Sequence, residues 1–346
     1  MGSGKEVFRR TRKLQASLED AGEQALLVGN RRNVFYLTGK DAGRIVVTPD
    51  ESVLFVRPLY RQLYSSLYGR GFPHRVVDFE EGAIKGFLKK EGVRKVCLDS
   101  GSAGALADYR KRLGVRVSVS DLVERQRAVK SDFEVDLIKK SCRIAHDAVY
   151  FAGCLLKPGK KELDVVADVE AFIRRRGSET PSFDDGMLLA SGRRSADIHA
   201  RPGLFPLLRG PVVVDLGAKI GGYNSDVTRT FGFGRLTARE KEVMDFVREL
   251  QQSAADLVRP GAVAGDVHKF AEEELKKAGF MFHHNLGHGV GLDIHELPNL
   301  SGKSEDVFKP GMVITVEPGV YLPRHFGVRH EDTFLVTKSK PKNLTA

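Results

Sequence analysis

Residues 212–231 read VVVDLGAKIGGYNSDVTRTF and place Asp215 and Asp226 on either side of a Gly-Gly pair. An apolar run, the pair Gly221-Gly222 and a second run rich in Val and Thr predict a β-hairpin. If the two glycines form the whole loop, Asp226 faces Gly217, and Asp215 lies two residues further along on the same face of the sheet. A loop shifted by one residue places the aspartates directly opposite each other. In either register two carboxylates share one face, which is costly unless a cation neutralises them.

Further donor residues follow in the second half of the chain. Four histidines lie within residues 283–295, in a glycine-rich segment that permits close backbone approach. Glu317 and Glu331 each stand at or near an apolar strand, where a solitary carboxylate would be unfavourable. Two Asp, two Glu and one His suit Mn, Co, Fe or Zn better than Ca. Such a set can hold two ions about 3.5–4 Å apart that activate water, so the residues predict a dinuclear metallohydrolase.

The pattern of the remaining chain predicts two domains. A helical stretch near residues 7–21 precedes an apolar run at 25–28 and strand candidates at 44–48, 52–56, 75–79 and 94–98, and this alternation favours an α/β domain. Ser131 and Glu134 have the spacing of a capping box that opens a long helix. We place the boundary before that helix, which gives domains of residues 1–125 and 126–346. The second domain mixes strands with helical stretches at 161–175, 237–258 and 264–278, so we expect an α/β (α+β) fold.

Composition limits the classes of partner. The 346 residues carry a net charge of +10, which raises nucleic acid as a partner. Residues 1–125 hold 23 basic and 15 acidic side chains, but the basic clusters fall on predicted amphipathic helices with interspersed acids, which favours a solvated face. No apolar stretch approaches the roughly 18 residues of a membrane span, and the first residues lack the apolar core of a secretory signal. The 3 cysteines are scattered. We expect a cytoplasmic protein with no membrane segment.

The five candidate donors also lie in motifs that resemble a known family. The motifs are D-x-G and G-Y-x-S-D-x-T-R-T around Asp215 and Asp226, G-H-G-V-G-L-D-x-H-E around His288, V-E-P-G-x-Y around Glu317 and V-R-x-E-D around Glu331. In this order they resemble the creatinase/aminopeptidase "pita-bread" metallopeptidases, most of all Xaa-Pro dipeptidases (prolidases) and Xaa-Pro aminopeptidases. Residues 33–39, NVFYLTG, resemble the N-terminal domain of that group. The resemblance covers nearly the whole chain and implies a creatinase/prolidase-like α/β domain followed by a pita-bread α/β domain.

The resemblance implies a metal-dependent exopeptidase that hydrolyses Xaa-Pro bonds through a hydroxide bridging two divalent ions. Mn or Co is the first expectation, with Zn and Fe as alternatives. One ion would be bound by Asp215, Asp226 and Glu331, and the other by Asp226, His288, Glu317 and Glu331. Glu317 would also carry a proton to the leaving nitrogen.

Residues beside these motifs match substrate-site positions of the family. The resemblance assigns catalytic roles, next to Glu317, to His199, His295 and Arg329. It assigns substrate binding to His199, His284, His295, Tyr321 and Arg329. Basic groups beside a carboxylate cage suit a peptide carboxylate or an oxyanion. Ile198 stands where many members have Pro, and His330 stands where Ile is usual, so these departures bear on substrate preference rather than on the metal ligands.

Several interpretations stay open. Dipeptidase and aminopeptidase activities share the motifs, and a related aminopeptidase without proline preference has them too. A non-catalytic pita-bread binding protein is the alternative from another class, but such a protein would be expected to lose ligands, and all five are present here. The family also implies small Xaa-Pro peptides as substrates and a homodimer, whereas nucleic acid is disfavoured as a partner.

Overall fold

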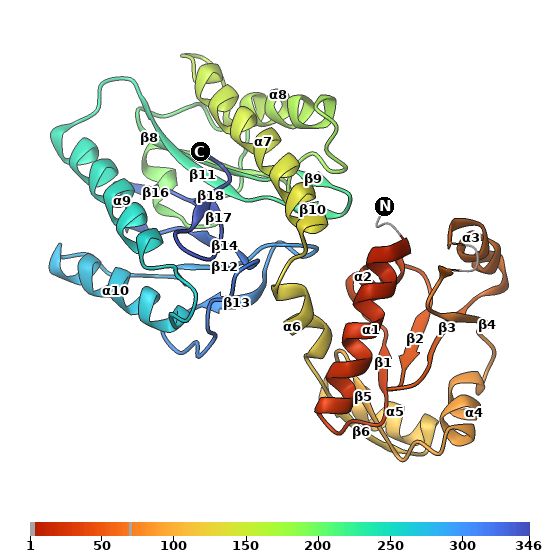
Figure 1. The fold of residues 1–346 in the computed structure, drawn as a ribbon. Coiled ribbons are helices and arrows are strands. Elements are labelled where there is room, and N and C mark those ends of the chain that lie inside the picture. The colour runs from red at the N-terminus through yellow and green to blue at the C-terminus, as the bar shows by residue number, and fades with distance from the viewer. Residues whose placement is uncertain (1–3, 69–70) are drawn as a thin grey trace. The chain divides into compact units, whose positions relative to one another are not determined.

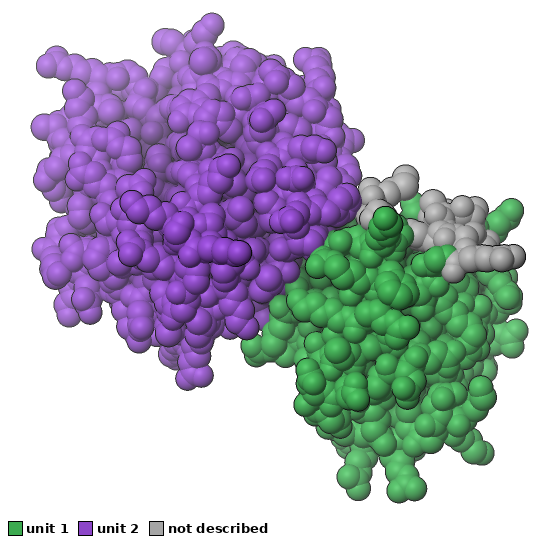
Figure 2. All heavy atoms as spheres, in the orientation of Figure 1, with its two compact units in different colours: residues 1–127 green, residues 128–346 purple. Residues whose placement is uncertain are grey.

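The computed structural model describes residues 4–68 and 71–346 of the chain. Contacts divide the chain into two compact units, residues 1–127 and 128–346 (Figures 1 and 2). The division falls within helix α6 (Leu122–Ala128), two residues beyond the boundary that the sequence predicts. Both units mix helices with sheets, so the expected α/β (α+β) class is confirmed.

Unit 1 holds, within its described residues, a six-stranded sheet in the order β4-β3-β2-β1-β5-β6. Apolar side chains of the central strands are fully buried against the surrounding helices, which is why each run of Val, Leu and Ile forms a strand here. The four predicted strands are confirmed, β1 forms within the apolar run at 25–28, and β6 was not predicted. The strands are β1 Leu26–Val28, β2 Arg44–Val47, β3 Ser52–Val56, β4 Arg75–Asp78, β5 Lys95–Leu98 and β6 Arg116–Val119. The helices before α6 are α1 Gly4–Asp20, α2 Arg31–Thr38, α3 Pro58–Tyr68, α4 Ala83–Lys90 and α5 Ala103–Leu113.

Unit 2 opens with the long helix α7 (Asp132–Leu155). The predicted capping box is present, because Ser131 Oγ accepts a hydrogen bond from Glu134 N and the Glu134 carboxylate accepts one from Ser131 N. The same carboxylate also accepts a hydrogen bond from the Tyr223 hydroxyl at 2.8 Å, so the cap ties the helix to the hairpin. The other helices of this unit are α8 Glu162–Arg175, α9 Ala238–Asp256 and α10 Ala264–Lys277.

The strands of unit 2 form two larger sheets and two short hairpins. Helices α7 and α8 pack on the sheet β11-β8-β7, and α9 and α10 pack on β13-β12-β14-β17-β18, each through its own apolar cluster. An isolated bridge between Thr228 and Glu331 joins the two sheets. The strands are β7 Leu188–Ser191, β8 Gly210–Leu216, β9 Lys219–Ile220, β10 Tyr223–Asn224, β11 Val227–Phe233, β12 Gly287–Gly289, β13 Glu296–Leu300, β14 Val313–Val316, β15 Gly319–Leu322, β16 Phe326–Arg329, β17 Asp332–Leu335 and β18 Lys342–Asn343.

Two further sequence expectations can be checked on the fold. No helix among the described residues is both long enough and apolar enough to cross a bilayer. The three cysteines are all free thiols, of which Cys97 and Cys142 are buried and Cys154 is exposed.

Candidate metal centre

The hairpin that carries the two aspartates has the register set by the two-glycine loop. Strands β8 and β11 pair with Val227 opposite Leu216 and Thr228 opposite Asp215. Gly221 and Gly222 both have positive φ, at 60° and 83°, as a tight two-residue turn requires. Asp215 and Asp226 therefore share one face of the ribbon at offset positions, and the register shifted by one residue is wrong.

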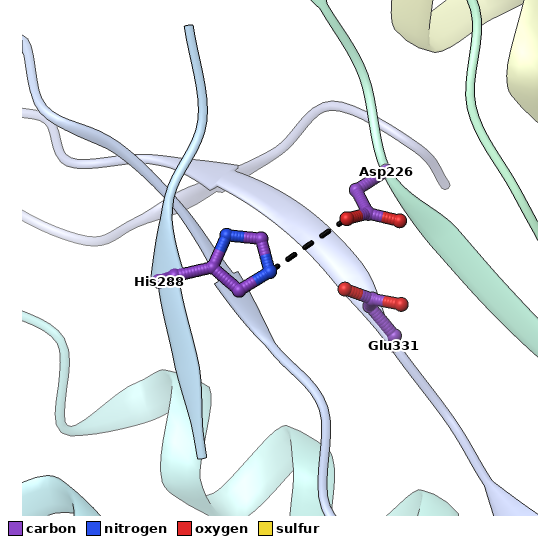
Figure 3. Close-up of side chains that lie close together, drawn as sticks. All are labelled: Asp226, His288 and Glu331. Atoms are coloured by element: carbon purple, nitrogen blue, oxygen red, sulfur yellow. Dashed lines mark ion pairs between the residues drawn. The ribbon is translucent and has the colours of Figure 1, made fainter. Parts of the chain in front are cut away.

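Three donor side chains converge beside this hairpin. Asp226 precedes β11, His288 lies on β12 and Glu331 precedes β17, and one ligand atom of each lies within 4.8 Å of the others. Figure 3 shows these three side chains pointing toward one another. The His288 Nε2 atom lies 3.7 Å from an Asp226 carboxylate oxygen and 3.4 Å from Glu317 Oε1. Asp226, His288, Glu317 and Glu331 are thus brought together from segments that are distant in sequence.

The tautomer of His288 follows from its second ring nitrogen. Its Nδ1 lies 3.1 Å from the carbonyl oxygen of Gly289, and a carbonyl only accepts hydrogen bonds. Nδ1 therefore carries the proton, and the lone pair of Nε2 is directed at carboxylate oxygens. A lone pair facing carboxylates is repulsive without a cation between them, and this orientation is the one in which a metal-ligating histidine is held.

Asp215, the fifth predicted donor, forms an ion pair with Arg329. Its Oδ2 atom accepts a hydrogen bond from Arg329 Nη2 at 2.5 Å. Its charge still reaches the cluster, since Asp215 is among the groups that raise the pKa values of Asp226, Glu317 and Glu331.

The electrostatics of the cluster are unfavourable for three charged carboxylates. Burial, reinforced by the neighbouring carboxylates, raises the pKa of Asp226 and the pKa of Glu331 well above their usual values. Burial also raises the pKa of Glu317 to about 8, against the opposing effect of Arg329. For His288 burial lowers the pKa, which keeps its imidazole neutral. The mutual repulsion that contributes to the raised pKa values of Asp226 and Glu331 would be relieved by a cation bound between the carboxylates.

The donor set fits divalent metal ions. Among the described residues, Asp215 Oδ1 and Glu331 Oε1 are buried and accept no hydrogen bond, which is costly for carboxylate oxygens unless a cation meets them. Four carboxylates and one neutral imidazole are ligands for Mn, Co, Fe or Zn. The residues present therefore match the metal chemistry that the sequence predicts.

A chain of polar side chains borders the carboxylates. The buried Arg329 guanidinium donates to the Tyr321 hydroxyl at 2.9 Å, and that hydroxyl lies 3.1 Å from His284 Nε2. Burial lowers the pKa of His284 to about 4, so its imidazole is neutral at pH 7. The structure thus joins three of the predicted substrate residues in one hydrogen-bonded row that begins at Asp215.

The other two predicted substrate residues are more exposed. The ring of His295 packs edge-on against His288, with centroids 4.2 Å apart, and burial lowers the pKa of His295 to about 4. His199 lies on the exposed segment after the 3₁₀ turn Gly192–Ala196, where its N–H donates to the Asp197 carboxylate. Burial is the main cause of the lowered pKa values of His284 and His295, and His199 makes a smaller contribution to both. His199 is therefore within electrostatic range of both rings.

Comparisons with known proteins agree with this geometry. Residues 136–338 match the model of metallopeptidase family M24, and residues 10–129 match the creatinase/prolidase N-terminal domain. The first of these matches spans more than half of the chain and includes all five donors. The chain belongs to metallopeptidase family M24.

Relatives within the M24 family match along nearly the whole chain. The Xaa-Pro dipeptidase of Pyrococcus horikoshii is 35% identical, over 97% of this chain and 96% of that protein. The crystal structure of the prolidase from Pyrococcus horikoshii OT3 has a TM-score of 0.88 and 34% identity, over 98% of each chain. The X-Pro aminopeptidase of Thermotoga maritima MSB8 has a TM-score of 0.84 and 26% identity, over 97% of each chain.

Sequence reasoning missed the polar residues that hold the candidate donors in place. Thr228 Oγ1 donates to Glu331 Oε2 at 2.6 Å, and Arg229 Nη1 donates to the Glu331 carbonyl at the same distance. Thr333 Oγ1 donates to the Asp226 carbonyl at 2.7 Å. The sequence did contain a signal for two of them, because Thr228 and Arg229 are polar residues of the T-R-T motif within a predicted strand. Side chains of this kind are buried in a strand only where they find partners.

Proposed function

We propose that this chain is a metal-dependent Xaa-Pro dipeptidase of the prolidase type. The observation that carries the proposal is the convergence of two buried carboxylates, Asp226 and Glu331, and the partly buried Glu317 on an imidazole whose Nε2 lone pair faces carboxylate oxygens. The full-length relatives named Xaa-Pro dipeptidase supply the substrate class. At 35% identity they favour a dipeptidase over an aminopeptidase, since the X-Pro aminopeptidase is 26% identical.

Five side chains would hold two divalent ions, Mn or Co in preference to Zn or Fe. Asp215, Asp226 and Glu331 would bind one ion, and Asp226, His288, Glu317 and Glu331 the other. When bound, such a pair supplies Lewis acidity toward a carbonyl and a hydroxide nucleophile at neutral pH. The unpartnered oxygens of Asp215 and Glu331 support this assignment.

The remaining residues would bind the dipeptide and move its protons. Glu317, at the edge of the cluster, would pass a proton to the leaving imino nitrogen of proline. Arg329 and Tyr321, which hydrogen bond to each other, would orient the substrate beside His284. His199 and His295, which are exposed, would contact the outer part of the dipeptide, where hydrogen-bonding groups suit its carboxylate.

The decisive experiment combines metal binding with substrate choice. The purified protein is expected to bind close to two Mn or Co ions per chain and to cleave Leu-Pro faster than any Leu-Pro-Yaa tripeptide. Asp226→Asn should abolish metal binding and cleavage. The control Asp99→Asn removes another buried carboxylate, one that accepts hydrogen bonds from Gly29 N and Asn30 N in unit 1, and should leave both intact.

Three outcomes would overturn parts of the proposal. A wild-type protein that binds no metal would favour a non-catalytic pita-bread binding protein. Cleavage of tripeptides in preference to dipeptides would indicate an Xaa-Pro aminopeptidase. Equal cleavage of peptides with and without proline would indicate an aminopeptidase of broader specificity.

We also propose that the enzyme works as a homodimer in the cytoplasm, on small peptides and without a nucleic-acid partner. The family resemblance supports the dimer, and three free thiols support a reducing compartment. Sedimentation of the purified protein should give twice the mass of the chain, and cell fractionation should recover it with cytoplasmic markers. A monomer or a membrane-bound pool would contradict these two expectations.

A further inference from the structure

The Thr345 side chain is fully buried and makes hydrogen bonds to the strand that follows Glu331. Its Oγ1 atom accepts a hydrogen bond from Thr333 N at 3.0 Å and donates to Asp332 Oδ1 at 2.8 Å. The main chain is held as well, since Thr345 N donates to Asn343 Oδ1 at 2.9 Å and the Thr345 carbonyl lies 2.9 Å from His146 Nδ1. One hydroxyl, with a single proton to donate, thus joins two consecutive residues of β17.

The first of these contacts leads to Asp226. The Thr333 N–H donates to Thr345, and the Thr333 hydroxyl donates to the carbonyl of Asp226 at 2.7 Å. Thr333 is therefore held at its backbone by Thr345 while its side chain fixes the backbone of a candidate bridging ligand. Asp226 stands immediately before β11, so this bond holds the backbone from which its carboxylate enters the cluster.

The second contact leads to Glu331. The Asp332 oxygen that accepts from Thr345 also accepts from Arg229 Nη2 at 2.6 Å. Arg229 Nη1 in turn donates to the Glu331 carbonyl at 2.6 Å. Arg229 Nη2 also contacts the Thr345 carbonyl at 3.3 Å, so Arg229 is held between Asp332 and Thr345.

We propose that Thr345 is a positioning residue of the metal centre: its hydroxyl sets the backbone of Asp226 and Glu331, the two residues that would contact both ions, through Thr333 and Asp332. The inference rests on the metal binding in the proposed function and goes beyond it, because Thr345 lies outside every motif that identifies the family. Two hydrogen bonds connect Thr345 to the Asp226 carbonyl through Thr333. The Asp332–Arg229 ion pair connects it to the Glu331 carbonyl.

Replacing the hydroxyl by a methyl group tests the inference. Thr345→Val preserves the shape of the side chain, but it leaves the buried N–H of Thr333 without its acceptor and removes one donor from Asp332. Groups that orient metal ligands from outside the ligand set are typically worth 10- to 100-fold in metal affinity. We expect the dissociation constant of the metal centre to rise by about 10- to 100-fold in Thr345→Val. Thr345→Ser, which keeps the hydroxyl, should restore it.

The measurements separate positioning from simple loss of stability. Calorimetric titration with Mn²⁺ gives the affinity, and the visible spectrum of the Co²⁺-loaded protein reports ligand geometry directly. Thr38→Val is the matched control, because Thr38 is also fully buried and its hydroxyl donates to the Val34 carbonyl in unit 1. We expect it to lower thermal stability with an unchanged Co²⁺ spectrum, whereas Thr345→Val should change both.

Each outcome decides the question. Wild-type affinity and an unaltered Co²⁺ spectrum in Thr345→Val would overturn the inference, while a wild-type protein that binds no metal would instead overturn the proposed function. If Thr345→Val does not fold, Asn343→Ala provides a milder change, since it removes the acceptor of the Thr345 N–H at a partly exposed position. That variant should weaken metal binding while remaining folded, and unchanged affinity would again overturn the inference.

Discussion

Gly287, one residue before His288, lies close to the backbone of the neighbouring strand, and a point mutation can test this approach. A Cβ atom added at this position would lie 2.1 Å from the Thr315 carbonyl oxygen, whereas real Cβ atoms essentially never come within 3.0 Å of another heavy atom. Thr315 belongs to the neighbouring strand β14, and its carbonyl is main chain that cannot rotate aside. Gly287→Ala must therefore push β12 away from β14 by about 0.9 Å.

That displacement acts on two candidate ligands together. The His288 N–H donates to Thr315 Oγ1 at 3.1 Å, and the same hydroxyl lies 3.4 Å from Glu317 Oε1. Moving β12 by nearly 1 Å carries His288 Nε2 away from Glu317 and loosens this shared contact. Misplacement by about 1 Å of a group that must be aligned for reaction costs on the order of 100-fold in rate. We therefore expect kcat/KM for an Xaa-Pro dipeptide to fall about 100-fold, with a parallel loss of metal affinity.

Gly86→Ala is the matched control for this prediction. Gly86 lies in α4, and an added Cβ would meet nothing within 4 Å, so alanine there should leave activity unchanged and raise helix stability slightly. The two variants are compared by steady-state hydrolysis and by the visible spectrum of their Co²⁺ forms. Wild-type activity and an unaltered spectrum in Gly287→Ala would refute the reasoning, because they would mean that the strands separate without moving His288.

Three further expectations concern stability. Lys130→Met should lower the free energy of unfolding of unit 2 by about 3–5 kcal/mol in urea denaturation. The substitution removes the ammonium group that lies 2.8 Å from the Glu296 carboxylate and leaves that buried charge without its counter-ion. The double variant Lys130→Met/Glu296→Leu should recover most of the loss. Burial lowers the pKa of His74 to about 4, so only the unfolded chain takes up its proton as the pH falls below about 6.5. Unit 1 should therefore lose about 2 kcal/mol between pH 7.5 and pH 5, a loss that is absent in His74→Gln when both are followed by amide hydrogen exchange. Chelation of the metal should lower the melting temperature of unit 2, and a transition that is the same with and without EDTA would speak against a metal bound at Asp226.

The shared face of Asp215 and Asp226 on a hairpin was predictable because its cause is local. A loop of Gly221 and Gly222 gives the observed pairing of Thr228 with Asp215, and a loop shifted by one residue keeps both aspartates on the same face. The capping box at Ser131 was predictable for the same reason, since both partners lie within one helical turn. The choice between the two hairpin registers was settled only by the structure, although the positive φ angles needed at both glycines favour the observed one.

The rest of the site depends on contacts between distant segments. The motifs name Glu317 and His288, but the 3.4 Å separation of their side chains results from the pairing of β12 with β14. Thr345 stands in no motif, and its role appears only where Thr333 and Asp332 meet it across the fold. A threonine near one end of a sequence resembles any surface threonine, and burial is the property that distinguishes it.

The two departures from the family pattern are compatible with the metal centre for different physical reasons. Ile198 contributes its main-chain carbonyl, which accepts a hydrogen bond from Arg329 Nη1 at 3.4 Å. Proline has the same carbonyl, so either residue can make this contact. His330 stands beside the candidate ligand Glu331, where the family usually has an apolar residue. Burial, together with the charge of Arg229, lowers the pKa of His330 to about 4. Its ring is therefore neutral at pH 7 and, like the isoleucine, adds no positive charge next to Glu331. Neither change requires a different metal site, so any effect they have should be confined to the choice of substrate.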